Sequence, residues 1–113
     1  MKKIEAFIQP EQFENVKKEL FAANVHKMSV SQVKGCGQQS GYTESFRGQI
    51  VEINLLQKTK IEIAVNEDYI KPTIDAIIRG ARTGNIGDGK IFVLDLPACY
   101  RVRTGEEGED AVG

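Results

Sequence analysis

The sequence predicts an α+β fold, a ferredoxin-like βαββαβ sandwich with a long exposed loop between its second and third strands. Residues 3–8 and 57–65 alternate apolar and polar side chains, a period of two that is typical of strands. Residues 13–20 and 70–81 carry apolar side chains at spacings of three and four, which are typical of helices. The order strand–helix–strand, found twice in one short chain, indicates two interleaved βαβ units.

In the first half, a helix is expected after the strand at 3–8. Pro10 lies where the first turn of a helix tolerates proline, and Asn24 is a plausible stop about 12–14 residues later. A second strand is expected over residues 27–35, with apolar side chains from Val25, Met28, Val30 and Val33. Residues 36–55 show few periodic signals, and a loop of that length in a small domain is usually functional.

The second half contains the clearest strand. Residues 57–65 point Thr59, Ile61, Ile63 and Val65 one way and Lys58, Lys60, Glu62 and Ala64 the other. In the helix that follows, Pro72 is expected in the first turn, although Asn66 to Asp68 suggest an earlier start. Residues 91–96 are expected as a buried strand, and residues 101–103 as a short edge strand before an acidic tail at about 104–113.

Composition narrows the function classes. The chain has 113 residues, 41% hydrophobic and 27% charged, which suits one domain over residues 1–113 with a buried core. The net charge of -1 excludes a broadly basic nucleic-acid binder. No apolar run approaches the roughly 20 residues that span a bilayer, and none of signal-peptide length precedes Pro10, so a cytoplasmic protein is expected.

Cysteine and histidine are scarce. Cys36, expected at a strand end, and Cys99, expected to be half-buried, are far apart, and His26 is the single histidine. This excludes a disulfide scaffold and a Cys/His zinc site.

A glycine-rich turn is the first candidate binding feature. In the segment Gly84–Lys90, glycines let the backbone approach a ligand, and the final lysine adds a charge for phosphate. The alternative is a helix cap at Gly84 followed by a tight Asp-Gly turn. The segment is not a Walker A motif, because Gly-x-x-x-x-Gly-Lys-Ser/Thr is absent from the chain.

Two further features could bind anions. Gly35 to Gln39 opens the long loop with two glycines and an amide that could contact oxygens, or it is simply a flexible loop. Arg101 and Arg103 would share one face of an edge strand and grip an anion together, or pair with Glu106 or Glu107. Lys58, Lys60 and Glu62 share one face of a strand. A charged strand face is unusual in a sandwich unless it contacts a ligand or another subunit.

The chain resembles the PII signal-transduction proteins over essentially its whole length, and five segments carry the resemblance. They are Val-Lys-Gly-Cys-Gly at 33–37, Tyr-Thr-Glu-Ser-Phe-Arg-Gly at 42–48, Lys-Ile-Glu-Ile at 60–63, Arg-Thr-Gly-Asn-Ile-Gly-Asp-Gly-Lys-Ile-Phe at 82–92 and Arg-Val-Arg-Thr-Gly-Glu-Glu at 101–107. The last two are long, and chance matches to both in one short chain are improbable.

The resemblance implies a homotrimer of ferredoxin-like subunits that binds ATP or ADP in the clefts between subunits. The implied nucleotide contacts are Met28, Ser29, Gly35, Cys36, Gly37, Gln38, Glu62, Gly87, Asp88, Gly89, Lys90, Arg101 and Arg103, the two arginines coming from the neighbouring subunit. Gln39 and Lys58 match the positions that hold 2-oxoglutarate together with Mg and ATP, with Gln39 as a Mg ligand. In the family these ligands control the flexible T-loop, here about 37–55.

The T-loop residues that the resemblance assigns to partner binding are Tyr42, Phe46, Arg47, Gln49, Ile50 and Val51. The implied partner is a membrane transporter such as an ammonium channel, which would recruit the chain to the inner face of the membrane, or a nitrogen-assimilation enzyme or a transcription factor. Neither a nucleic-acid partner nor insertion in the membrane is expected.

Four positions depart from the family pattern. Val51 stands where the uridylylated tyrosine is usual and Gln49 where other members carry the phosphorylated serine, so neither modification is expected. Gln38 replaces a basic contact to the terminal phosphate of ATP, a loss of about 1–2 kcal/mol that narrows or reverses the preference for ATP over ADP. Lys27 replaces a glycine beside the ribose.

The sequence therefore predicts a regulatory nucleotide-binding protein rather than an enzyme. Gln38 favours an energy sensor with a weak or absent response to 2-oxoglutarate. The alternative is a slow nucleotide hydrolase that uses Lys90 and the arginine pair, although no residue is an obvious general base.

Overall fold

The computed structural model describes residues 1–35 and 55–113. Of the loop expected at about 37–55, all but the last residue lies outside this part. The elements are β1 (Lys2–Ile8), the 3₁₀ turn η1 (Pro10–Gln12), α1 (Phe13–Ala22), β2 (Ser29–Gly35), β3 (Leu56–Val65), α2 (Glu67–Ala81), β4 (Gly89–Asp95) and α3 (Glu109–Val112).

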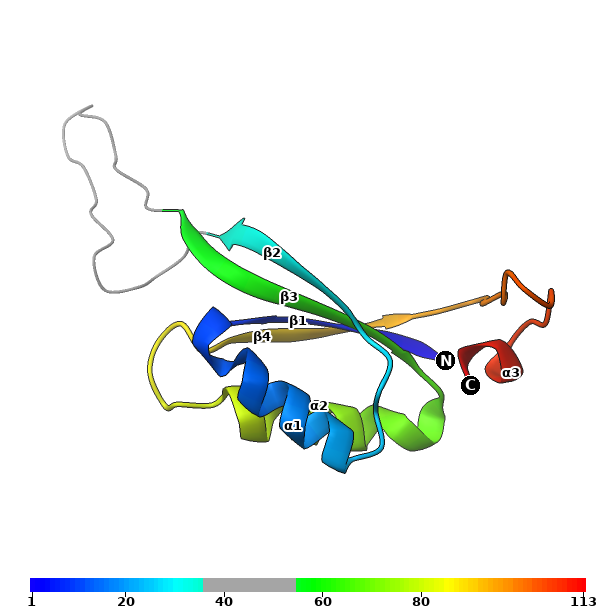
Figure 1. Ribbon diagram of the computed structural model, residues 1–113, viewed down its shortest axis with the longest axis horizontal. Helices are drawn as coiled ribbons and strands as arrows, with labels where there is room; N and C mark the ends of the chain where they lie inside the picture. Colours follow the sequence, from blue (N-terminus) through cyan, green and yellow to red (C-terminus); the bar gives the residue numbers. More distant parts are fainter. Residues whose placement is uncertain (36–54) are drawn as a thin grey trace.

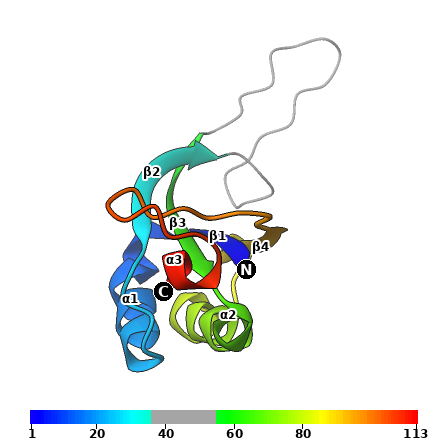
Figure 2. The same ribbon diagram turned by 90° about the vertical axis from the view of Figure 1, so that its right-hand side faces the viewer.

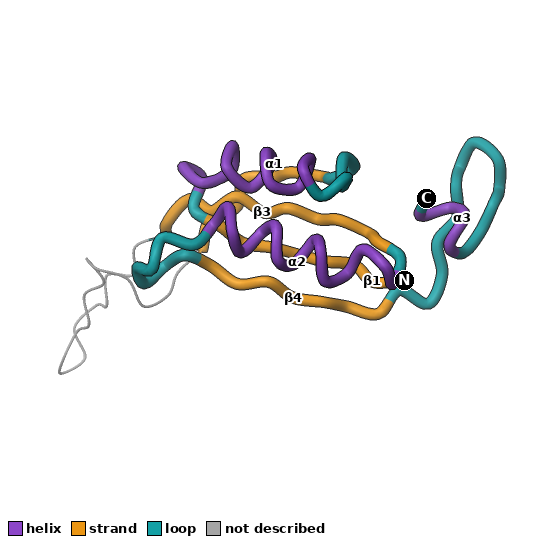
Figure 3. The backbone as a smooth tube through the Cα atoms, turned by 90° about the horizontal axis from the view of Figure 1, so that it is seen from below, coloured by secondary structure: helices purple, strands orange, loops and turns teal. Residues whose placement is uncertain are grey.

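The four strands form one antiparallel sheet in the order β2-β3-β1-β4. Helices α1 and α2 lie side by side across one face of this sheet, and no other helix or strand of residues 1–35 and 55–113 covers the opposite face (Figures 1 and 3). Figure 2 shows the same two layers end on, with α3 and the C-terminus at one end of the sheet. The α+β, ferredoxin-like prediction is confirmed.

The core lies between the sheet and the two helices. The side chains of β3 that were expected to share a face with Ile61 are buried, and the opposite set is more exposed, as predicted. The buried apolar residues are Ile4, Ala6, Ile8, Val16, Leu20, Val25, Ile61, Ile63, Val65, Ala76, Ile77 and Ala81. A shift of one residue along these strands would exchange the buried and the exposed side chains, so the register of the central strands is well determined.

Helix α1 follows the prediction closely. Pro10 starts a 3₁₀ turn that leads directly into the helix. Asn24 adopts a left-handed conformation with a φ of 64°, and Val25 donates its N–H to the carbonyl of Leu20. These features end the helix in the way that Asn permits.

Helix α2 corrects the expectation for Pro72. The helix begins at Glu67, so Pro72 lies inside it rather than in the first turn. The missing N–H of a proline leaves one helical carbonyl without its usual donor. Since Pro72 and Asp68 are both exposed, water can hydrate that carbonyl.

The C-terminal part brings two further corrections. The strand expected to be buried is an edge strand, β4, on which Phe92, Val93 and Leu94 are between 42% and 50% exposed. The expected edge strand at 101–103 is wrong: Val102 and Arg103 lie in a turn, which Tyr100 and Glu107 close as an isolated bridge. No helix within residues 1–35 and 55–113 is both long enough and apolar enough to cross a membrane.

Candidate functional site

The glycine-rich turn connects α2 to β4 and is organised by the carboxylate of Asp88. Asp88 Oδ2 accepts hydrogen bonds from the backbone N–H of Thr83 at 2.7 Å and of Gly84 at 2.9 Å, and Oδ1 accepts one from the Thr83 hydroxyl. The hydroxyl of Thr83 first, and then these N–H groups, hold the pKa of Asp88 below its usual range. The carboxylate therefore belongs to the turn, and a ligand would meet the backbone here.

Glycine is required where this turn enters β4. Gly89 has a φ of 119°, and a Cβ at this position would lie 1.8 Å from the carbonyl oxygen of Phe7. The backbone of the turn is thus packed directly on β1. A side chain would force the two segments apart.

Two side chains anchor the middle of the turn from other elements. Lys58 Nζ donates a hydrogen bond to the carbonyl oxygen of Gly87 at 3.0 Å, and Gln9 Nε2 donates to the same oxygen at 2.8 Å. Lys58 was expected from the sequence and Gln9 was not. No local signal could have found Gln9, because it contacts a residue 78 positions away along the chain.

The predicted residues at this end of the sheet lie together. Gly35 ends β2 beside Lys58, since a Cβ on Gly35 would lie 3.6 Å from Lys58 Cγ. Lys90 is exposed on β4, opposite Phe7 of β1. The first group therefore consists of Gly35, Lys58, Gly87, Asp88, Gly89 and Lys90.

A second group of predicted residues starts in the middle of the sheet, because Glu62 lies two residues along β3 from Lys60, which shares a row with Phe7 and Lys90. Ser29 begins β2 and pairs with Glu62 of β3, and the preceding Met28 packs partly against the core. Glu62 forms ion pairs with Lys3 at 2.6 Å and with Lys60 at 3.4 Å. Lys3 first, and then Lys60, lower the pKa of Glu62.

The two arginines complete the second group and differ in their surroundings. Arg101 is half-buried and donates to Glu106 Oε1 at 2.7 Å and to the carbonyl of Asp110 at 2.9 Å. The pairing with Glu106, one of the two alternatives that the sequence left open, is therefore present. Arg103 is exposed and, within the described residues, forms no ion pair.

The glycine-rich turn and the arginine segment lie at opposite ends of one sheet, so a single chain does not bring these two features together. Lys58 of β3 donates to Gly87 of the turn, and Asn66, directly after β3, donates to the carbonyl of Glu109 in the C-terminal segment. These two residues are eight positions apart along the strand, which corresponds to about 26 Å. Figure 1 shows the turn after α2 at one end of the sheet and the segment before α3 at the other. A site that uses both the turn and the arginines must take them from two different chains.

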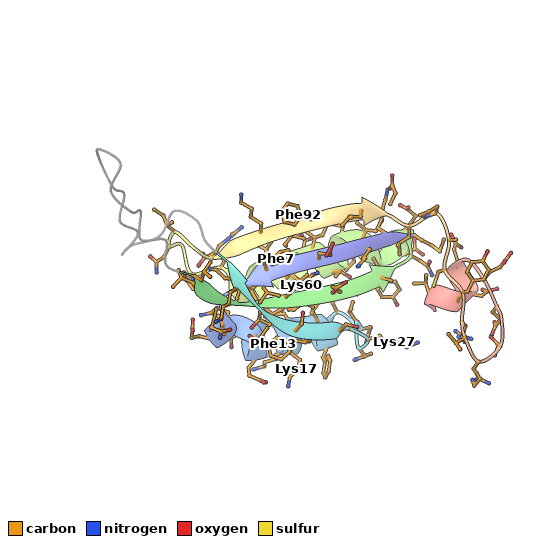
Figure 4. The ribbon with its side chains drawn as sticks, turned by 90° about the horizontal axis from the view of Figure 1, so that it is seen from above. Phe7, Phe13, Lys17, Lys27, Lys60 and Phe92 are labelled. Carbon is orange, nitrogen blue, oxygen red and sulfur yellow. The ribbon has the colours of Figure 1, made fainter. Side chains whose placement is uncertain are left out.

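The face of the sheet opposite the helices is charged and aromatic. Phe92, Phe7 and Lys60 lie on the neighbouring strands β4, β1 and β3 (Figure 4). The two phenylalanine rings meet edge to face with centroids 6.0 Å apart, and Lys60 Nζ lies 5.7 Å from the Phe7 ring centroid and 3.3 Å from the Glu5 carboxylate. Its hydrogen bond with Glu5, the largest cause, and its other carboxylate contacts raise the pKa of Lys60.

Neither the pocket near the turn nor a cluster of metal-binding side chains indicates a further ligand in the described residues. A pocket of about 420 Å³ lies behind the turn, but isoleucines make up half of its lining, so it suits apolar matter better than phosphate. Within residues 1–35 and 55–113, no group of three or more His, Cys, Asp or Glu side chains could hold a metal ion. Cys99 is half-buried, as predicted.

Several predicted residues lie outside the described part of the chain. They are the nucleotide contacts Cys36, Gly37 and Gln38, the magnesium ligand Gln39, and the partner-binding residues Tyr42, Phe46, Arg47, Gln49, Ile50 and Val51.

Comparison with known proteins identifies the family. Residues 1–106 match the family model described as nitrogen regulatory protein P-II. The chain is 50% identical to nitrogen regulatory protein P-II 2 of Methanothermobacter thermautotrophicus over 99% of its length and 97% of that protein, and 46% identical to P-II 1 of Escherichia coli over 99% of its length and all of that protein. A crystal structure of Arabidopsis thaliana PII bound to citrate superposes with a TM-score of 0.77 at 38% identity, covering 97% of this chain and 87% of that one. The chain therefore belongs to the nitrogen regulatory protein P-II family.

Proposed function

We propose that the chain forms a homotrimer, binds ATP or ADP in the clefts between subunits, and regulates a partner through its loop at about 37–55. The partner would be a membrane transporter such as an ammonium channel, a nitrogen-assimilation enzyme or a transcription factor. The observation that carries the proposal is the separation of the glycine-rich turn and the arginine segment, which lie at opposite ends of the sheet (Figure 1). This placement makes sense if each cleft uses the turn of one subunit and the C-terminal segment of the next.

The turn is suited to the phosphates of a nucleotide. Asp88 directs its carboxylate into the turn, where backbone N–H groups and the Thr83 hydroxyl donate hydrogen bonds that stabilise its negative charge. Gly89 leaves the backbone open to close approach, and Lys90 offers an exposed ammonium group. Backbone amides with a nearby lysine are a common arrangement for binding phosphate.

The C-terminal segment would supply the second half of each cleft. Arg101 is tied to Glu106 and to the backbone of Asp110, so it shapes the segment. Arg103 is exposed and lies two residues further along the same turn. We therefore expect Arg103 to be the more readily available of the two arginines for a phosphate on the neighbouring subunit.

The uncovered sheet face would form the centre of the trimer. Phe92 and Leu94 are 50% and 42% exposed, and they lie next to ion pairs that are themselves only partly exposed. An exposed apolar patch with polar groups around it is typical of a surface that binds another protein. A second and a third copy of the chain would cover it in a closed ring.

The choice of nucleotide is expected to depend on Gln38, which carries no charge for the terminal phosphate. We propose that ADP binds at least as well as ATP. Magnesium would be held mainly by the phosphates of ATP, since magnesium usually binds through substrate phosphates and few protein ligands. Gln39 and Lys58 are the residues that would contact 2-oxoglutarate, and we expect its binding to be weak or absent.

Calorimetric titration tests this proposal directly. The wild type is titrated with ADP, with Mg-ATP and with Mg-ATP plus 2-oxoglutarate, and its mass in solution is measured by light scattering. We expect a trimer that binds both nucleotides, with affinity lost in Lys90→Ala and Arg103→Ala and kept in Lys17→Ala, which lies on the outer helix α1. A monomer, or a trimer that binds neither nucleotide, would contradict the proposal. Steady phosphate release from ATP would favour the hydrolase instead.

A further inference from the structure

Two side chains converge on one carbonyl oxygen in the glycine-rich turn. Gln9 follows β1 and Lys58 lies on β3, yet both donate to the oxygen of Gly87, at 2.8 Å and 3.0 Å. Both contacts are partly buried, and a carbonyl oxygen has two lone pairs, so the oxygen is fully used. We call this arrangement the Gly87 clamp.

The clamp determines where the next backbone N–H points. No peptide bond in the described residues is cis, and in a planar trans peptide the carbonyl and the following N–H point in opposite directions. With the Gly87 oxygen held by Gln9 and Lys58, the N–H of Asp88 faces away from these two side chains. This N–H lies at the end of the turn formed by Ile86 and Gly87, and within the described residues it makes no hydrogen bond of normal length and angle.

The peptide between Gly87 and Asp88 needs such a clamp because glycine does not restrict the backbone at this position. Gly87 has a φ of 101°, a conformation that glycine enters and leaves at little cost. Lys58 alone is an unreliable restraint, because an anion bound beside the turn would also attract its ammonium group. Gln9 is neutral, so a bound anion does not compete for it in the same way.

We infer that Gln9 is a positioning residue for phosphate binding. It holds the Gly87 carbonyl so that the N–H of Asp88 is presented to the nucleotide, and it keeps this orientation when Lys58 turns toward an anion. This inference rests on the proposed nucleotide-binding function. It assigns to Gln9 a role that acts through the Gly87 peptide and requires no contact between Gln9 and the ligand.

The test combines Gln9→Met with Lys58→Met. Methionine keeps the length of glutamine but donates no hydrogen bond. We expect Gln9→Met to weaken ADP binding about threefold when Lys58 is present, and about tenfold in the Lys58→Met background, because the two donors share one acceptor. Adenosine, which has no phosphate, should bind all variants equally. Gln12→Met is the matched control, since the Gln12 side chain contacts Asn15 and lies outside the clamp.

Three results would overturn the inference: an unchanged ADP affinity in Gln9→Met, equal effects of Gln9→Met in both backgrounds, or an equal loss of adenosine binding. The ¹³C chemical shift of the Gly87 carbonyl, measured without ligand, provides a separate readout. It should move in Gln9→Met and stay constant in Gln12→Met, and a constant shift in Gln9→Met would also overturn the inference. If the wild type binds no ADP, the proposed function fails, while the carbonyl shift still decides whether Gln9 orients this peptide.

Discussion

Asp88 shows how a single carboxylate can organise the turn that we propose binds phosphate. Its two oxygens accept hydrogen bonds from Thr83 and Gly84, which lie at the start of the same turn. Negative charge beside a phosphate would normally weaken binding. Here the charge is satisfied within the turn, so the exposed backbone and Lys90 determine the electrostatics that a ligand meets.

The lowered pKa of Asp88 predicts a pH dependence of the turn. Because the folded pKa lies below the unfolded value of about 3.9, the ionised carboxylate stabilises the turn above the unfolded pKa, and this contribution is lost as the pH falls through the folded pKa. We expect the NMR signals of the Thr83 and Gly84 amides to move in that acidic range and not between neutral pH and the unfolded pKa.

The matched variants for this titration are Asp88→Asn and Asp75→Asn. The first should abolish the acidic movement of both amides, and the second should leave it intact, since Asp75 pairs with Lys71 on α2. Movement that persists in Asp88→Asn would show that another group controls the turn.

At the scale of single residues, the sequence predicted which residues belong to the turn better than it predicted the orientation of their side chains. The spacing of Gly84, Gly87 and Gly89 indicated a turn that could approach a ligand, and Lys58 was expected near it from the family resemblance. The orientation of the Asp88 side chain and the role of Gln9 were not predictable. Both depend on hydrogen bonds set by the folded backbone, and the contact of Gln9 crosses most of the chain.

The two helices pack so closely that one position between them must be glycine. A Cβ on Gly80 of α2 would lie 2.5 Å from Cα and 2.7 Å from N of Val16 in α1. Both contacts are with backbone atoms, which cannot rotate away as a side chain can. The helices would have to separate to admit even a methyl group.

We therefore expect Gly80→Ala to destabilise the protein by about 1–3 kcal/mol, as overpacking in a core does. Lys71→Ala on the same helix is the control, because Lys71 is 85% exposed and its ion pair with Asp75 contributes little. Urea denaturation of both variants measures the effect. A Gly80→Ala variant as stable as the wild type would mean that the helices are free to move apart.

Elements with strong periodicity were predicted correctly, and those with ambiguous patterns were not. The alternation in β3 and the helical spacing of α2 each identify one buried face, so both were found. The apolar run at 91–96 does not distinguish a central strand from an edge strand, because that depends on which strands pair. Arg101 and Arg103 alternate like a strand, but hydrogen bonds from Arg101 to Glu106 and Asp110 bend the segment into a turn.

For the whole molecule, the uncovered sheet face is the feature that needs a partner. In the trimer that we propose, Phe92 would lie within the interface, so Phe92→Asp would place an unpaired charge there and dissociate the trimer. Phe21→Asp is a well-matched control: Phe21 is 46% exposed, close to the 50% of Phe92, but lies on α1. Light scattering should give a smaller mass for Phe92→Asp alone, and a Phe92→Asp trimer would contradict this use of the face.

The central claim is that each nucleotide site is shared between two subunits, and subunit mixing tests it most directly. Lys90→Ala disables the turn, and Arg103→Ala disables the C-terminal segment, so trimers of either variant alone should bind ADP poorly. When the two variants are unfolded, mixed in equal amounts and refolded together, about a quarter of the clefts should join an intact turn to an intact segment. The proposal predicts that ADP binding of wild-type affinity returns in the mixed trimers at about that fraction of sites. If the mixed trimers bind no better than the separate variants, both halves of the site belong to one chain, and the claim is wrong.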